Sequence, residues 1–256
     1  GMYTSCLNYG ANYGDLSKGH RANGYTTDGA FTQYAVNHVN TLVRVPDFMS
    51  DEEATLIVTA GTAMYGLDVL GGLVAGQSLV VTGAGPIGLL GVAVGKALGA
   101  APVILTDIVD GRLEIGERLG ADHVINAARE PAVEAVKKFN GGRGVNFVLE
   151  CSGAPNAVNE AIHMVNRGGR VCLSAFSHGL ASVDTKHIVA NNIYLYGIRG
   201  EGQSAVRRAA SLMTQKRFDA SLIHTHTFPL GELPTGLRYA REKIDGAIKV
   251  VIKNQD

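Results

Sequence analysis

Short runs of β-branched and other apolar residues recur through the middle of the chain, and amphipathic segments separate them. Continuous apolar runs of this length are typical of strands buried on both faces of a parallel sheet, and the segments between them have helical spacing. The runs that predict strands are 79–81, 103–105, 123–125, 145–149, 170–173 and 192–196. Because strands and helices alternate, the pattern predicts an α/β fold with a doubly wound, six-stranded parallel sheet.

Helices are expected between and after these strands. The predicted ranges are 111–119, 157–165, 203–216 and 232–243, with a last strand over 248–252. Asp110 is a candidate N-cap for the first of these helices, and Gly120 ends it. Ahead of the sheet, Ser50 and Glu53 have the spacing of a capping box, so a further helix begins there and the sheet domain is expected to begin near residue 60.

The chain divides into three regions by composition. Residues 1–59 are rich in Gly, Asn and Tyr, which indicates loops and short strands rather than alternating strands and helices. Residues 60–201 hold the alternating pattern, and residues 202–256 hold the last two helices and the last strand. We therefore expect one α/β domain flanked by segments of a different structure.

A glycine-rich turn follows the first predicted strand and opens a helix. Gly83, Gly85 and Gly88 have the G-x-G-x-x-G spacing, and Asp107 ends the next apolar run. In a dinucleotide-binding Rossmann fold the first glycine permits a tight turn, the second lets the backbone approach a pyrophosphate, and the third lets the helix pack close to the strand. The acidic residue accepts both hydroxyls of the adenosine ribose. This order of elements predicts a dinucleotide site.

A membrane span is the alternative interpretation of residues 78–95, which carry no charge. Gly91 and Gly95 even have the G-x-x-x-G spacing of membrane helices. The other glycines and the proline of this segment argue against a span, and Lys96 follows at once. A helix packed against a sheet needs small residues for the same reason, so we expect no membrane partner.

Charge and cysteine content narrow the function classes. The chain has 23 basic and 23 acidic residues and is 46% hydrophobic. This balance gives no electrostatic basis for binding nucleic acid or an anionic membrane, and favours a small-molecule substrate. Cys6, Cys151 and Cys172 are too few and too scattered for a disulfide framework, and no signal peptide is visible, so a cytoplasmic location is expected.

Several motifs together resemble the medium-chain alcohol and polyol dehydrogenases of the zinc type. The motifs are 24–34, 60–65, the glycine-rich turn with Asp107, 150–153, 167–171, 228–230 and 248–252. The resemblance implies a Rossmann domain beside a β-rich, GroES-like catalytic domain, of which residues 1–59 are a remnant and to which residues 202–256 return. It also implies NAD(H) as coenzyme and a homodimer or higher homo-oligomer. The apolar run 192–196, the last strand of an open sheet, is the expected joining edge.

The coenzyme contacts of that family fall on specific residues of this chain. They are Gly83, Gly85, Pro86, Ile87 and Gly88 for the pyrophosphate, Asp107 and Arg112 for the ribose, and Cys151 with Ser174, Ala175 and Phe176 for the nicotinamide side.

The zinc ligands of the family are not found in this sequence. Three of the catalytic ligands belong to a region that would precede residue 1, and the fourth position falls on Thr59, which is not a side chain that zinc favours. The family's nicotinamide-facing threonine lines up with Ala63, although Thr62 is adjacent and a small shift of a loop would restore it. Cys6 resembles the last of four cysteines of a structural zinc lobe whose other three are absent. We therefore assign no metal ligand and leave the catalytic residues unknown.

The remaining cysteines and histidines have ordinary interpretations. Cys151 is expected to pack beside the coenzyme as a small apolar residue, and Cys172 to lie in the core. His224 and His226 would point to one face of a strand, as a metal pair does, but no third ligand is near them in sequence. His38 and His178 are loop candidates for a proton relay.

The function expected is that of an NAD(H)-dependent oxidoreductase that transfers hydride between nicotinamide and a small alcohol, polyol or carbonyl compound. Two alternatives remain open. One is a zinc-independent medium-chain reductase, in which hydroxyl or backbone donors polarise the substrate oxygen. The other is an NAD-binding remnant without catalytic activity.

Overall fold

The computed structural model describes residues 24, 28–37, 39, 42–201 and 203–254. These residues fold into two compact units, one formed by the described residues within 56–223 and the other by the described residues before 56 together with those from 224 to 254. Each unit is described by itself.

The first unit is built on a six-stranded parallel sheet. Its strands are β1 (Leu79–Thr82), β2 (Val103–Asp107), β3 (His123–Asn126), β4 (Val145–Glu150), β5 (Val165–Leu173) and β6 (Tyr194–Gly197). They lie in the order β3-β2-β1-β4-β5-β6, with β1 pairing in parallel to both β2 and β4. This is the strand order of the dinucleotide-binding fold, so the predicted fold class is confirmed.

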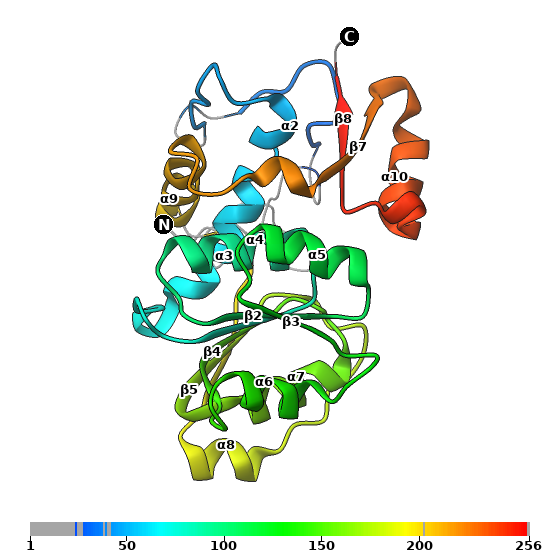
Figure 1. Cartoon of the computed structure of the whole chain (residues 1–256). Coiled ribbons are helices and arrows are strands. Elements are labelled where there is room, and N and C mark those ends of the chain that lie inside the picture. The colour runs from blue at the N-terminus through cyan, green and yellow to red at the C-terminus, as the bar shows by residue number, and fades with distance from the viewer. Residues whose placement is uncertain (1–23, 25–27, 38, 40–41, 202, 255–256) are drawn as a thin grey trace, which may run out of the picture. The chain divides into compact units, whose positions relative to one another are not determined.

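Helices cover both faces of this sheet. Figure 1 shows α3 (Ile57–Asp68), α4 (Pro86–Ala97) and α5 (Asp110–Arg118) over one face, and α6 (Ala132–Phe139), α7 (Pro155–Met164) and α8 (Thr185–Asn191) over the other. The short helices η4 (Val69–Gly71) and η5 (Ala220–Ile223) belong to the same unit. The arrangement agrees with the doubly wound fold that the alternating pattern predicts.

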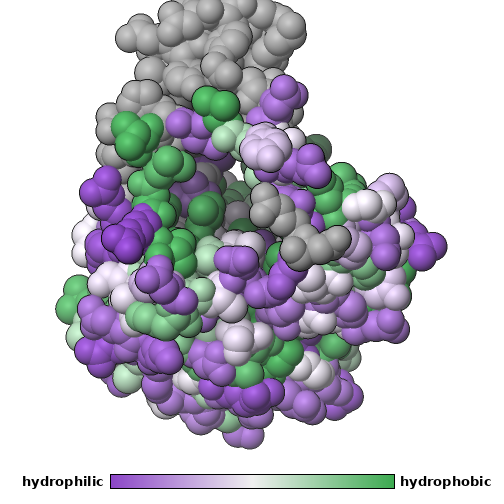
Figure 2. Space-filling model, turned by 90° about the horizontal axis from the view of Figure 1, so that it is seen from above, coloured by the Kyte–Doolittle hydropathy of each residue, from purple (hydrophilic) through white to green (hydrophobic). Residues whose placement is uncertain are grey.

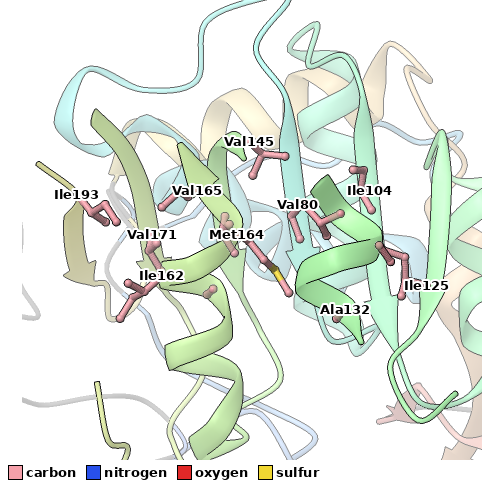
Figure 3. Close-up of a cluster of buried hydrophobic side chains, with 14 residues drawn as sticks. Val80, Ile104, Ile125, Ala132, Val145, Ile162, Met164, Val165, Val171 and Ile193 are labelled. Atoms are coloured by element: carbon pink, nitrogen blue, oxygen red, sulfur yellow. The ribbon is translucent and has the colours of Figure 1, made fainter. Parts of the chain in front are cut away.

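A buried apolar cluster fills the space between the sheet and helices α6 and α7. Figure 3 shows its members from the strands facing those from the helices: Val80, Ile104, Ile125, Ala132, Val145, Ile162, Met164, Val165, Val171 and Ile193. Each fully buried aliphatic side chain contributes about 1.5–3 kcal/mol relative to exposure. This packing holds the strands in register and so fixes where their carboxyl ends lie.

Several element boundaries differ from the sequence expectation. Helix α5 begins at Asp110 itself, because Val109 occupies the N-cap position and no side chain caps the helix. Strand β5 begins at Val165 rather than at residue 170, because Val145 of β4 pairs with Val165 before the register shifts. The predicted helix over 157–165 therefore ends one residue earlier, at Met164.

Helix α9 (Gln203–Thr214) packs on α3 within the sheet unit, although residues 202–256 are expected from the sequence to return to another domain. Gly61 makes this packing close, since an added Cβ would lie 2.8 Å from Cγ2 and 3.1 Å from Cα of Val206. Arg208 also forms an ion pair with Asp68 of α3. The sheet unit therefore extends from Leu56 to Ile223, beyond the expected range of 60–201.

The second unit holds α2 (Asp51–Ala54), β7 (His224–Pro229), η6 (Leu230–Glu232), α10 (Leu233–Glu242), η7 (Ile244–Gly246) and β8 (Lys249–Lys253). β7 and β8 form a two-stranded parallel sheet. Ser50 caps α2 by accepting the Glu53 N–H at 3.2 Å, as the capping box predicts, and Lys253 pairs with Glu52 at 2.7 Å.

Short strands expected before residue 59 are not seen in residues 28–37 and 42–58, which form bends, turns and helices. Aromatic and apolar side chains such as Phe31 and Tyr34 are exposed there. A strand forms only where a neighbouring strand offers hydrogen-bonding groups, and the described residues of this segment have no such neighbour in this structure.

One helical stretch, Asp51–Gly71, is long and apolar enough to cross a membrane by length and composition alone. Its α3 portion buries Ala60, Met64 and Leu67 among others, as a core helix does. On the face shown in Figure 2, hydrophilic residues predominate and hydrophobic ones form smaller groups between them. Residues 78–95, for which a span is the alternative, form β1, the glycine-rich turn and α4.

Candidate dinucleotide site

The turn between β1 and α4 has the backbone geometry that its glycines predict. Gly83 has a φ of 86°, in the left-handed region, and its N–H donates to Thr106 O at 2.7 Å. A Cβ on Gly83 would lie 2.8 Å from Cα of Ser152. The turn after β1 therefore lies directly against the loop after β4.

The other two glycines of the motif have different surroundings. A Cβ on Gly88 would lie 1.8 Å from the Gly83 carbonyl oxygen, so only glycine allows α4 to start so close to the strand. A Cβ on Gly85 would meet no atom within 4 Å among the described residues. Open space at the second glycine is what the approach of a pyrophosphate to the backbone requires.

Helix α4 begins at this open position. Gly85 is its N-cap and Pro86 its first residue, followed by Ile87, and all three are half-buried. The first N–H groups of a helix lack partners within the helix, and the helix dipole places partial positive charge there. The turn therefore presents donors and a favourable field to an anion such as a pyrophosphate.

Asp107 at the end of β2 is held by backbone donors. Its Oδ2 accepts the Ala84 N–H at 2.6 Å, and its Oδ1 accepts the N–H groups of Ile108 at 2.8 Å and Val109 at 2.9 Å. A carboxylate has about four acceptor positions, so roughly one is left, on Oδ2. Asp107 thus fixes the glycine-rich turn to the end of β2 and has room for one ribose hydroxyl, rather than the two expected from the sequence.

Glu150 is a residue of the candidate site that the sequence analysis did not single out. It is 1% exposed at the end of β4. Its Oε1 accepts the N–H groups of Ser152 at 2.7 Å and Gly153 at 3.0 Å, and the hydroxyls of Ser152 at 2.5 Å and Thr82 at 3.4 Å. An acidic residue that ends an otherwise apolar strand was the available signal. Glu150 shapes the loop against which Gly83 packs.

The expected nicotinamide-side residues lie at the ends of β4 and β5. The Cys151 thiol is 3.1 Å from the Ser174 hydroxyl, which donates to Glu150 O at 2.8 Å. Burial raises the pKa of the Cys151 thiol, so the sulfur stays a neutral thiol. Phe176 is 82% exposed on the loop that follows β5. Cys172, inside β5, is fully buried, and burial raises its pKa to about 12.

The residues lined up with the missing zinc ligand and the nicotinamide-facing threonine all lie on α3. Ala63 is fully buried, whereas Thr59 and Thr62 are half-buried. The Thr62 hydroxyl lies 3.2 Å from Glu201 Oε1, a partner that the sequence did not suggest. Because Thr62 is in a helix rather than a loop, no small shift of the chain brings it to the place of Ala63.

The histidine candidates are not brought together with a third ligand in the described part of the chain. His224 and His226 alternate with exposed residues on β7, but His224 Nε2 bonds the Thr227 hydroxyl at 2.8 Å, and the ring of His226 packs on Tyr239. His178 is exposed on a loop. His38 and Cys6 lie outside the described residues.

Arg112 lies on the first turn of α5 and is half-buried. Helix α5 follows the carboxyl end of β2, where the register pairs Asp107 with Asn126 of β3. The structure therefore collects the glycine-rich turn, Asp107, Arg112, Cys151 and Ser174 on one unit, along the carboxyl edge of its sheet.

Comparisons with known proteins agree with this site. Residues 86–215 match the family model of zinc-binding dehydrogenases. An L-threonine 3-dehydrogenase of Pyrococcus abyssi is 41% identical over 178 residues, which cover 69% of this chain and 51% of that protein. The chain thus spans about half the length of the curated relatives it matches.

Solved structures show the same fold. The 2R,3R-butanediol dehydrogenase of Bacillus subtilis superposes with a TM-score of 0.75 at 25% identity, over 83% of this chain and 60% of that one. A short chain alcohol dehydrogenase of Escherichia coli CFT073, complexed with the cofactor NADH, gives a TM-score of 0.83 over 96% of this chain and 72% of its own, at 23% identity. The latter likeness shows the fold alone.

The strand order, the glycine-rich turn and the acidic end of β2 define a dehydrogenase-type dinucleotide-binding unit. The chain belongs to the zinc-binding dehydrogenases, the medium-chain alcohol dehydrogenase family. Members of this family are dehydrogenases that act on small molecules.

Zinc is implied by the family, but the described residues do not fit it. Three or four ligands are needed, and no group of three His, Cys, Asp or Glu residues lies together in the described part of the chain. Thr59, which stands at the expected ligand position, has a neutral hydroxyl. We derive no step of the reaction through zinc.

Proposed function

We propose that this protein is an NAD(H)-dependent oxidoreductase that transfers hydride between nicotinamide and a small alcohol, polyol or carbonyl compound. The observation that carries the proposal is the open space at Gly85, at the start of α4, next to a turn that Asp107 ties to the end of β2. We assign the sheet unit as the coenzyme-binding domain and the flanking segments as parts of a catalytic domain.

The residues of this unit would bind and orient the coenzyme, which supplies the hydride chemistry when bound. Gly85, Pro86, Ile87 and Gly88 provide the helix start that receives the pyrophosphate. Asp107 offers its remaining acceptor position to the adenosine ribose, with Arg112 beside it. Cys151 and the 174–176 segment line the end of the sheet where the nicotinamide would lie.

L-Threonine is the first substrate to test, because the curated relatives are L-threonine 3-dehydrogenases. A steady-state assay that follows NADH formation with L-threonine, simple alcohols and polyols tests the proposal directly. Turnover that Gly85→Ala abolishes, while the fold is kept, would support it. Saturable NADH binding without turnover of any of these compounds would support the coenzyme site. The same result would contradict the proposed oxidoreductase activity of this chain.

A second candidate is NAD(H) binding without turnover. The observation that favours it is the threonine at position 59 together with the lack of a three-ligand group in the described residues. A zinc-independent reductase is the other variant, and the Thr62 hydroxyl beside Glu201 is the polar pair that its substrate site could use. Loss of activity in Thr62→Ala, with unchanged NADH binding, would distinguish this reductase from both other candidates.

We also propose a homo-oligomer, most simply a dimer, in the cytoplasm. Among the described residues β6 pairs with a strand on one side only, with β5, so its other edge is a candidate for pairing with another copy. Tyr194 on this strand is 53% exposed. Cys151 and Cys172 are free thiols with raised pKa values, which suits a reducing compartment.

A further inference from the structure

A polar cluster lies behind the turn that Asp107 organises, and the proposed function does not use it. Asp110, the first residue of α5, accepts the side-chain N–H of Asn126 at 2.7 Å and forms an ion pair with Arg129. Asn126 ends β3 and also donates to Ile108 O at 3.5 Å. The cluster therefore ties the loop from Asp107 to Asp110 to the end of β3 and the residues that follow it.

The cluster lies beside Asp107, the residue proposed to bind the adenosine ribose of the coenzyme. β2 and β3 are neighbours with Asp107 opposite Asn126, and the Ala127 N–H donates to Asp107 O at 2.9 Å. In this fold the acidic residue after β2 meets the ribose 2′-hydroxyl, and a nearby arginine accommodates a 2′-phosphate in enzymes that use NADP(H). Arg129 is 71% exposed on its side chain, and its cation is occupied by Asp110.

Asp107 would supply only part of the repulsion of a 2′-phosphate. Three backbone N–H groups already point at its carboxylate and compensate part of its negative charge. Asp110 is a second carboxylate, half-exposed and a few residues further along the chain. It both adds negative charge at this edge and holds the arginine that would otherwise bind a phosphate bidentately.

We propose that Asp110 is a specificity-determining residue, which disfavours NADP(H) by holding Arg129 away from the 2′-phosphate. This inference rests on the proposed coenzyme site and names a further determinant of its selectivity. The chemical group that this site would discriminate against is the phosphate on the adenosine 2′-oxygen. Removing the negative charge of Asp110 should have two effects at once. It should release the Arg129 cation, and it should remove one charge that repels the 2′-phosphate.

The test is calorimetric titration of the full chain with NADH, NADPH and the adenosine fragments 5′-AMP and adenosine 2′,5′-bisphosphate. In Asp110→Asn we expect affinity for NADPH and for the bisphosphate to rise about tenfold, since an arginine–phosphate contact is charge-assisted, while NADH binding changes less than about twofold. The gain should shrink as salt is added, because exposed charges are screened.

Matched variants separate release of Arg129 from simple loss of charge. Glu114→Gln removes one exposed carboxylate from the same helix outside the cluster, and it should leave the NADPH-to-NADH ratio within about twofold. Arg129→Met should cost little NADPH affinity in the wild-type chain but remove most of the gain in Asp110→Asn. This coupling is the signature of an arginine that Asp110 restrains.

Three results would overturn the inference. They are an unchanged ratio in Asp110→Asn, an equal gain in Glu114→Gln, and a gain that persists undiminished in the double variant Asp110→Asn/Arg129→Met. Failure of the proposed coenzyme site is a different result, in which the wild-type chain binds neither NADH nor 5′-AMP.

Discussion

At the scale of single residues, substitutions of Gly85 and Gly88 are expected to have different effects, the first on coenzyme binding and the second on folding. Both belong to the same turn, but a methyl group at position 85 enters open space, whereas one at position 88 collides with the backbone oxygen of Gly83. Open space beside a helix start is where the coenzyme phosphates would lie. The two glycines therefore belong to the same sequence motif but have different physical roles: Gly85 leaves space for the coenzyme, and Gly88 allows the turn to pack closely.

Gly85→Ala should keep the fold and lose the coenzyme. We expect its unfolding free energy to stay within about 1 kcal/mol of wild type, since Gly85 has an ordinary extended backbone and alanine is only a poorer N-cap. NADH affinity should fall at least about tenfold, because the methyl group occupies the approach to the phosphates. Gly88→Ala should destabilise the chain by at least about 2 kcal/mol, since its obstacle is backbone. Urea unfolding and NADH titration of both variants check this, and equal stability of the two would contradict it.

Glu150 is a residue on which the fold of the site depends. Glu150→Leu should destabilise the chain by about 3–5 kcal/mol, because it leaves the N–H groups of half-buried Ser152 and buried Gly153 without their acceptor. Glu150→Gln keeps an acceptor oxygen and loses only the charge, so we expect about 1–2 kcal/mol. Denaturant unfolding measures both. A leucine variant as stable as wild type would show that the Ser152 loop does not need this carboxylate.

At the scale of elements, the contact between α3 and α9 depends on Gly61. Gly61→Leu should destabilise the sheet unit by about 1–3 kcal/mol, because the larger side chain meets the backbone of Val206 as well as its side chain. Gly111→Ala is the matched control on α5, where an added Cβ meets no described atom within 4 Å, and it should stabilise slightly through helix propensity. Thermal unfolding of the two variants should move in opposite directions, and a tolerated leucine would mean that α9 does not pack on α3 in solution.

The strand β6 carries the prediction of assembly. Tyr194→Lys should convert the proposed dimer to a monomer, since a lysine on an edge strand opposes pairing with another copy. Leu237→Lys changes an exposed apolar residue of α10 and should leave the assembly unchanged. Light scattering at micromolar concentration reports the mass of each variant. A wild-type monomer, or a dimer that survives Tyr194→Lys, would contradict the role of this edge.

The six-stranded parallel sheet could be predicted from the sequence because apolar runs of this kind are typical of strands buried on both faces. The order of the strands comes from the structure. The glycine-rich turn could also be predicted, since its φ angle and its close approach require glycine at positions 83 and 88. Contacts between residues far apart in the chain could not be inferred from local patterns. The Thr62–Glu201 pair, the packing of α9 on α3, and the contact of the Thr82 hydroxyl with Glu150 each depend on how the elements come together.

At the scale of the whole molecule, the residues of the proposed coenzyme site are all present in the structure, whereas the expected zinc ligands are not found among the described residues. The glycine-rich turn, Asp107 and Glu150 all belong to one compact unit, so we expect the proposed NAD(H) binding to require no other part of the chain. The described residues offer no three-ligand group for zinc. Binding and turnover can therefore be separated experimentally, and binding is the property that the structure supports most directly.

Calorimetric titration of the purified chain with NADH and NADPH is the most direct test of the coenzyme site. We expect saturable binding of NADH and a preference of roughly 30- to 1,000-fold over NADPH, because like charges about 4 Å apart near a surface repel by on the order of 4 kcal/mol at an effective dielectric constant of 20. Gly85→Ala should weaken this binding at least about tenfold without unfolding the chain. Equal or tighter binding of NADPH, or no saturable binding of either dinucleotide to a folded chain, would contradict the site assigned to Gly85 and Asp107.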